Sequence, residues 1–215
     1  MSDSPAILPG SRWNISSLFQ EQARRSVLHR TARLAATLLL AMVAGRGLAQ
    51  TRYRIDPSTS QVQFVLQGFH TVHGHFSVSS GDITFDRATG AMSGSVAIAA
   101  ASGNSNDTLR DKRMDKEELK VKKYPVVTFA PAKFTGMLAQ TGSSTIQVKG
   151  ILTLLGTPHP ITVPMTVDIR GADCTARGTF LVPYVEWGMK DPSNFLMHMD
   201  KQVTVSLDFK GTLSK

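Results

Sequence analysis

The chain has 215 residues, a formal net charge of +8 and one cysteine, and 41% of its residues are hydrophobic. The first 49 residues hold six of the 24 Lys and Arg residues and two of the 16 Asp and Glu residues, so the remainder carries only +4. That small excess gives little support to nucleic-acid binding, which needs a strongly basic surface. The single cysteine, Cys174, excludes an internal disulfide, so the fold must be held by its own core.

Residues 1–49 have the pattern of an export leader. Four arginines at 24, 25, 30 and 33 stand just before an apolar run at 34–45 that is too short to span a bilayer, and the small residues Gly47 and Ala49 follow it. This order predicts a secretory signal peptide cut after Ala49, and hence a periplasmic or secreted protein. Arg24-Arg25 resembles a twin-arginine signal, so ordinary and twin-arginine export both stay open. A retained anchor or a surface amphipathic helix is the alternative.

The remaining residues, 50–215, have the size of one domain with a single core. Short segments alternate between apolar and polar residues and are separated by Gly, Asp or Pro, which is typical of half-buried strands. The expected strands are 62–66, 74–78, 81–85, 93–98, 126–129, 132–134, 145–150 running into 152–156, 161–169, 178–182 and 202–209. The prediction is an all-β domain of roughly eight to ten strands that curl into a barrel.

Residues 102–123 interrupt these strands with a polar, charged stretch. Residues 106–108 can cap a helix, and 107–123 is rich in good helix formers. Pro125 ends any helix at or before the preceding residue. We expect one short helix that covers an open end of the barrel as a lid. Its narrow apolar stripe would comprise Leu109, Met114 and Leu119.

The segment 161–169 has the cleanest alternation, with five apolar residues on one face. Pro164 lies on its opposite face, and because proline cannot donate a ladder hydrogen bond, we predict an exposed edge or a bulge there. The apolar faces of such strands point into the barrel, where they either fill the interior or leave room for one elongated ligand. Alternation alone leaves both outcomes open.

The order and spacing of several motifs resemble the YceI-like family of exported, lipocalin-like proteins, often called polyisoprenoid-binding proteins. The motifs are Tyr53-Arg-Ile-Asp56, Val62-Gln-Phe64, Gly74-His-Phe76, Gly81-Asp-Ile83-Thr-Phe85-Asp86, Arg110-Asp111 with Met114, Tyr124-Pro125 with Phe129, residues 148–156 and residues 203–211. The likeness runs from about residue 53 to residue 213. It implies an extended antiparallel lipocalin-like β-barrel of about eight strands with one short helix as a lid.

Three features depart from the family pattern. Where the family often carries Phe-Phe before the Tyr-Pro motif, this chain has Glu118-Leu119-Lys-Val121. Arg113 stands in place of the His that many members have near the Arg-Asp pair, and residues 183–192 form a loop that only some relatives carry. These departures leave the fold in place and bear on the identity of the ligand.

The resemblance implies a carrier or buffer that holds an isoprenoid-type lipid, such as a polyprenyl phosphate or a quinone, in an apolar tunnel. Such a tail cannot cross water unaided, because each buried CH2 is worth about 0.8 kcal/mol. The residues expected to line the tunnel are Phe64, Phe76, Phe85, Ile98, Met114, Phe129, Val148, Leu152, Val163, Met165, Val167 and Trp187. Arg110 is the candidate headgroup contact, although Arg110 and Asp111 could equally be a structural pair that pins the lid.

Two polar clusters have both a functional and a plain interpretation. His70, His73 and His75 could bind a metal, but no cysteine or acidic ligand lies near them, and a solvated strand end is the expected role. The basic residues of 110–123 could attract a phosphate headgroup or make transient contact with a membrane surface. They could also form an exposed helix face balanced by the acidic residues among them.

The chain has no nucleophile elbow, paired-carboxylate motif or glycine-rich phosphate loop. We therefore expect no enzymatic activity, no metal and no cofactor apart from the bound lipid. The alternative function is a periplasmic stress-response or interaction protein with a packed barrel and no ligand. The oligomeric state stays open, a dimer included.

Overall fold

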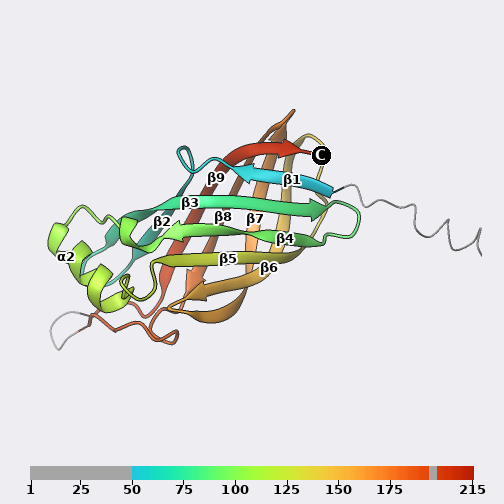
Figure 1. The fold of residues 1–215 in the computed structure, drawn as a ribbon. Coiled ribbons are helices and arrows are strands. Elements are labelled where there is room, and N and C mark those ends of the chain that lie inside the picture. The colour runs from blue at the N-terminus through green and yellow to red at the C-terminus, as the bar shows by residue number, and fades with distance from the viewer. Residues whose placement is uncertain (1–49, 194–197) are drawn as a thin grey trace, which may run out of the picture. The chain divides into compact units, whose positions relative to one another are not determined.

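The computed structural model describes residues 50–193 and 198–215, and the predicted leader 1–49 lies outside the described residues. Nine strands form one sheet in the order β1-β3-β2-β9-β8-β7-β6-β5-β4, closed by additional β1–β9 and β3–β4 pairs (Figure 1). The strands are β1 (Gln50–Ile55), β2 (Gln61–Leu66), β3 (Val72–Asp86), β4 (Met92–Ala99), β5 (Val126–Thr135), β6 (Gly142–Leu154), β7 (Thr157–Arg170), β8 (Asp173–Val182) and β9 (Val203–Ser214). No helix among the described residues is long and apolar enough to cross a membrane.

Strands β1 and β2 share one position in the barrel wall. β1 pairs with the second half of β3 and the end of β9, whereas β2 pairs with the first half of β3 and the start of β9. The turn between them is fixed by the carboxylate of Asp56, which accepts hydrogen bonds from the backbone N–H of Ser58 and the hydroxyl of Thr59. Nine strands therefore occupy eight positions, and the predicted all-β barrel of about eight strands is confirmed.

Two strands each join two of the expected segments into one. β3 joins the expected strands 74–78 and 81–85, and β5 joins 126–129 and 132–134. In both cases a shift of register, between Val78 and Ser80 or between Pro131 and Lys133, carries the ladder through the residues that interrupt the alternation. β1 was not among the expected strands, although it completes the wall beside β3 and β9.

The alternation in β7 has the predicted orientation. Its apolar residues from Ile161 to Ile169 point inward, and Pro164 is exposed on the outer face. The β7–β8 ladder stops at the pair Met165–Gly178, directly beside Pro164, so the predicted edge at this proline is present. We use the term seam for the unpaired stretch between residues 157–164 of β7 and residues 179–182 of β8.

The predicted helix forms, and it is shorter than the helix-forming stretch. α2 (Thr108–Arg113) continues into a π-helical turn, η2 (Met114–Glu118), and we call these two elements the lid. The Asp107 side chain caps α2 by accepting hydrogen bonds from the backbone N–H groups of Leu109 and Arg110, both at 3.0 Å. The lid lies at one end of the barrel, and β1 enters at the other (Figure 1). A short 3-10 turn, η1 (Ala100–Ser102), leads toward the lid.

The end of the barrel away from the lid is filled by side chains, and we call it the packed end. Phe85 and Phe134 meet edge to face with their ring centroids 6.2 Å apart. The buried Tyr53 hydroxyl donates to the carbonyl oxygens of Phe209 and Cys174, at 3.0 and 3.2 Å. Burial raises the pKa of the Cys174 thiol to about 11, so this thiol stays protonated at neutral pH.

Candidate functional site

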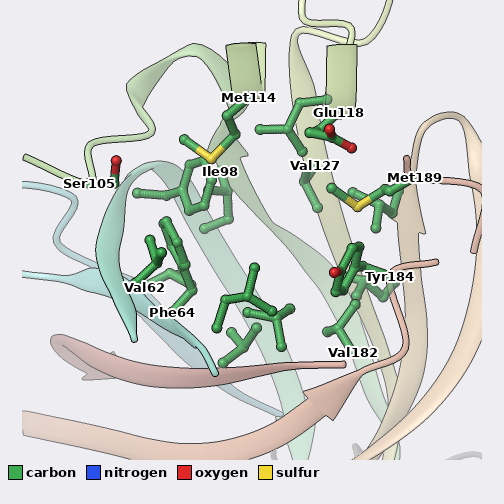
Figure 2. A pocket seen from close by; sticks show the side chains of 18 of the residues that line it. Val62, Phe64, Ile98, Ser105, Met114, Glu118, Val127, Val182, Tyr184 and Met189 are labelled. Carbon is green, nitrogen blue, oxygen red and sulfur yellow. The ribbon is translucent and has the colours of Figure 1, made fainter. Parts of the chain in front are cut away.

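Beneath the lid, the barrel encloses an apolar cavity of about 790 Å³ (Figure 2). Every strand except β1 contributes side chains to it, and the lid and the loop after β8 close it from above. Its volume falls within the range of roughly 300–1,000 Å³ that is usual for ligand sites in proteins. The lining is Val62, Phe64, Leu66, His70, Val72, Phe76, Val96, Ile98, Ser105, Asp107, Leu109, Arg110, Arg113, Met114, Glu118, Leu119, Val127, Thr128, Phe129, Leu152, Leu154, Ile161, Val163, Phe180, Val182, Tyr184, Met189, Lys190, Pro192, Met199, Val203, Val205, Leu207 and Phe209.

The structure brings seven of the twelve expected lining residues to this cavity. They are Phe64, Phe76, Ile98, Met114, Phe129, Leu152 and Val163. They come from seven different elements, and the alternation of each strand is what turns them inward. Their contact with a ligand stays a prediction.

The other five expected residues do not line the cavity, which corrects the expected lining. Phe85, Val148, Met165 and Val167 belong to the large buried cluster of the barrel, which also includes the cavity-lining Val62 but extends beyond the cavity into the packed end. Alternation shows which face of a strand points inward, but it carries no information on depth along the barrel axis. The fifth, Trp187, packs beside the seam.

The loop that follows β8 closes the seam. The Trp187 indole stacks on the His159 imidazole of β7, with ring centroids 4.0 Å apart and ring planes within 9°. Trp187 also packs against a buried cluster that includes Leu154 on one side of the seam and Val182 on the other. The Tyr184 hydroxyl donates to the Asp200 carbonyl oxygen at 2.7 Å and anchors the base of this loop. The loop is therefore part of the cavity wall.

Sequence reasoning missed several lining residues in this loop. Tyr184 and Met189 extend into the cavity from it, and Met199 lines the wall just before β9 (Figure 2). None of them lies in a period-two strand, so alternation could not identify them. The only signal was the concentration of aromatic and sulfur-containing residues in a segment that interrupts the strand pattern.

Ser105 ties the lid to the loop that precedes it. Arg110 donates from Nε to the Ser105 hydroxyl at 2.7 Å and from its terminal nitrogen to the Ser105 carbonyl oxygen at 2.6 Å. The Asp111 carboxylate accepts from the Ser105 backbone N–H at 2.9 Å and from its hydroxyl at 2.5 Å. Arg110 lines the cavity mouth, so its predicted headgroup contact stays open, but in this structure Arg110 and Asp111 act as the pair that pins the lid.

The apolar stripe expected on the lid is only partly buried. Leu119 is buried and Met114 half-buried, whereas Leu109 is 79% exposed at the mouth. The π-helical turn accounts for this arrangement, because the backbone N–H of Leu119 bonds to the Met114 carbonyl oxygen five residues back, at 2.8 Å. The wider turn presents Met114, Glu118 and Leu119 together to the cavity.

Two carboxyl groups of η2 lie in poorly solvated positions. Burial is the main cause that raises the pKa of Glu118, against the lowering effect of the Lys190 backbone N–H and ammonium group. Burial, with a contribution from the nearby Asp111 charge, raises the pKa of Asp115. Of these two groups, only Glu118 faces the cavity.

The three clustered histidines do not converge. His70 lies at the cavity mouth, while His73 and His75 lie on the exposed outer face of β3 opposite Val65 and Gln63 of β2. Within residues 50–193 and 198–215, no three His, Cys, Asp or Glu side chains are grouped so that they could hold a metal ion.

The model of the YceI-like domain matches residues 53–211 of this chain. The chain belongs to the YceI-like family. The resemblance predicted from the motifs is thereby confirmed, with nearly the same boundaries. A UPF0312 protein of Pseudomonas putida (strain W619) is 31% identical over 175 residues, which is 75% of this chain and 88% of the relative. A UPF0312 protein of Pseudomonas syringae pv. tomato is 30% identical over 69% of this chain and 77% of its own length.

Solved structures show that this YceI-like domain shares its fold with other proteins. BcnA of Burkholderia cenocepacia superposes with a TM-score of 0.60 at 23% identity, covering 75% of this chain and 99% of BcnA. A polyisoprenoid-binding domain from Saccharophagus degradans superposes with a TM-score of 0.59 at 17% identity, covering 74% of this chain and 98% of that domain. At these identities the likeness establishes the barrel architecture alone.

Proposed function

We propose that this YceI-like protein holds one isoprenoid-type lipid in the cavity beneath the lid and acts as its carrier or buffer. The observation that carries this proposal is the apolar cavity of about 790 Å³, lined by side chains from eight strands. The Saccharophagus degradans domain with the same fold is described as polyisoprenoid-binding, which supports an isoprenoid ligand. The candidate ligands are a polyprenyl phosphate and a quinone. The proposed binding requires no cofactor.

The cavity volume sets an expected tail length. A water-sized group occupies roughly 30 Å³ in a liquid, so the cavity accommodates on the order of 25 non-hydrogen atoms, or about five isoprene units. The packed end prevents the tail from running farther along the barrel axis. A longer tail must therefore fold back on itself or leave part of its length outside.

The cavity favours a carrier over the alternative of an interaction protein with a packed barrel. A packed barrel would have its inward-facing residues in contact along the whole axis, as they are at the packed end. A dry apolar space of this size is instead suited to lipid tails, whose burial is worth about 0.8 kcal/mol per CH2. Nothing in the proposal requires chemistry on the lipid, and we propose a binding protein that is not an enzyme.

Two exposed apolar residues suggest how the lipid enters. Phe69, in the loop between β2 and β3, is 72% exposed, and Leu109 on α2 is 79% exposed. Both segments border the cavity mouth, which His70 and Leu109 line. We propose that these side chains make transient contact with a membrane surface while the lipid passes. The periplasmic or secreted location predicted from the leader is consistent with this role.

Native mass spectrometry tests the proposed function. The protein is purified from its host under non-denaturing conditions, and its mass is compared before and after incubation with prenyl alcohols of increasing length. We expect a one-to-one lipid complex, with uptake that strengthens up to about five isoprene units and then levels off. Recovery of unliganded protein alone, with no uptake of any added prenyl lipid, would overturn the proposal.

A further inference from the structure

We infer that Glu118 makes this cavity select a lipid whose head carries a hydrogen-bond donor, such as a prenyl alcohol or a quinol. Lipids that end in an ether or a phosphate would bind less well. The inference rests on the proposed lipid-binding function and narrows its candidate class: it favours a prenyl alcohol or the reduced form of a quinone over a polyprenyl phosphate or the oxidised quinone. It follows from the position of one carboxyl group in an otherwise apolar wall.

Glu118 is directed toward the cavity from η2, near Met114 in Figure 2. Its Oε2 atom is inaccessible to solvent and has no hydrogen-bond partner among the described residues. Other polar groups of the lining do have partners, because the Ser105 hydroxyl bonds to Asp111 and the Tyr184 hydroxyl donates to Asp200. One oxygen of Glu118 therefore lacks a partner within the cavity wall, although the Lys190 backbone N–H and ammonium group lie close enough to the carboxyl to lower its pKa.

Burying a hydrogen-bond acceptor without a partner destabilises the protein. A ligand that supplies a donor to this acceptor removes that cost and therefore binds more tightly. An O–H or N–H group on the ligand can make a short, charge-assisted bond to a carboxylate oxygen. An ether oxygen cannot, because it is itself only an acceptor.

The charges at the mouth also disfavour a phosphate. Arg110 is hydrogen-bonded to Ser105 and lies 4.0 Å from the Asp107 carboxylate. Lys190 binds Glu117 at 2.7 Å, and Arg113 lies 4.0 Å from the same carboxylate. Each cation of the lining is thus engaged with protein carboxylates, and Glu118 adds a negative charge that would repel the phosphate oxygens.

The test compares three C20 ligands that share one tail: geranylgeraniol, its methyl ether and its monophosphate. Equilibrium affinities are measured for the full chain and for Glu118→Leu, Glu118→Gln and Glu186→Leu. Glu186→Leu is the matched control, because Glu186 is exposed and does not line the cavity.

For the native protein we expect the alcohol to bind about tenfold more tightly than the ether, with the phosphate no tighter than the ether. Glu118→Leu should bind alcohol and ether equally, Glu118→Gln should keep part of the preference through its amide oxygen, and Glu186→Leu should keep all of it. Equal affinity of the native protein for alcohol and ether, tightest binding of the phosphate, or a preference that survives Glu118→Leu would overturn the inference. Absence of binding by all three ligands would instead overturn the proposed function.

Discussion

Trp187 lies face to face with His159, and this stacked pair spans the point where the barrel wall has no ladder hydrogen bonds between β7 and β8. The indole comes from the loop after β8 and the imidazole from β7, so their contact joins the two edges of the seam. Along the seam, the barrel wall is closed by packed side chains and not by hydrogen bonds between strands. We therefore expect the seam to open more easily than the parts of the wall that are joined by ladder hydrogen bonds.

Trp187→Ala removes this closure, and we expect the bound lipid to dissociate several-fold faster. Trp187→Phe keeps an aromatic face over His159 and should dissociate close to the native rate. Stopped-flow transfer of a fluorescent prenyl lipid to acceptor vesicles measures both rates. A native rate in Trp187→Ala would show that the lipid leaves through the lid alone.

The cavity and the packed end respond differently to the same added bulk. Ile98→Trp places an indole in the cavity (Figure 2), where we expect loss of lipid uptake and little change in stability. Val167→Trp overfills the packed end, where Val167 is only 7% exposed, and should lower the free energy of unfolding by about 1–3 kcal/mol. Urea denaturation and lipid titration of both variants give the comparison. If Val167→Trp blocks uptake while the protein stays fully stable, the packed end is not packed.

Much of the fold could be predicted because alternation reports directly on which side chains face inward. The residues from Ile161 to Ile169 and the edge at Pro164 were identified correctly for this reason. The lid was also predictable, since Asp107 is a strong cap and the helix formers behind it have no strand periodicity. The depth of each residue was not predictable. Val163 and Val167 have the same pattern in the same strand, yet only Val163 reaches the cavity.

The polar part of the site was harder to predict than the apolar part. Glu118 was noted in the sequence only as a departure from an aromatic pair, because a π-helical turn cannot be recognised from residue types. Its orientation depends on how the lid is pinned by Ser105, a contact between residues of a loop and a helix. Tyr184 and Met189 belong to a loop without periodicity, so the structure was needed to place them in the wall.

Phe69 and Leu109 are predicted to act in lipid entry and not in lipid binding. Replacing both by Ser removes exposed apolar surface at the mouth; Phe69 does not line the cavity, and Leu109 lines it only at the mouth, where 79% of this residue is exposed. We expect slower uptake of a prenyl lipid from vesicles, with an unchanged equilibrium affinity for the same lipid in detergent. Replacement of Met137, an exposed residue outside the lining, by Ser is the control and should not alter either quantity. Unaltered uptake in the double variant would argue against membrane contact through these residues.

Ser105→Ala should loosen the lid. The substitution removes the hydroxyl that Arg110 and Asp111 share, and it leaves two charged partners with unfilled hydrogen-bonding positions. We expect the free energy of local unfolding of the lid to fall by about 1–2 kcal/mol, which would be visible as faster amide hydrogen exchange across residues 105–119. Ser206→Ala, on the exposed outer face of β9, is the matched control, because this hydroxyl bonds only to Thr179 among the described residues. Equal exchange rates in Ser105→Ala and the native protein would show that the lid is held by its apolar contacts.

Glu118 should make the domain less stable as the pH rises. Burial is the main cause that raises the pKa of this carboxyl, the Glu117 charge adds to the effect, and Lys190 and Arg113 oppose it. Because the folded state then binds this proton more tightly than the unfolded state does, stability falls with increasing pH. The loss of stability begins near pH 4.5, the ordinary pKa of a glutamate side chain, and is complete above the folded-state pKa of Glu118.

Glu118→Gln isolates this effect, because the amide cannot titrate while Asp115, whose pKa is also raised by burial, is present in both proteins. We expect the two proteins to have similar urea midpoints near pH 4, and the native midpoint to fall progressively below that of the variant toward pH 8. A bound prenyl alcohol should reduce the difference, since its hydroxyl would supply the missing partner of the carboxylate. A difference that is constant with pH, or one that favours the native protein at high pH, would mean that the Glu118 carboxylate is well solvated and does not face an apolar cavity.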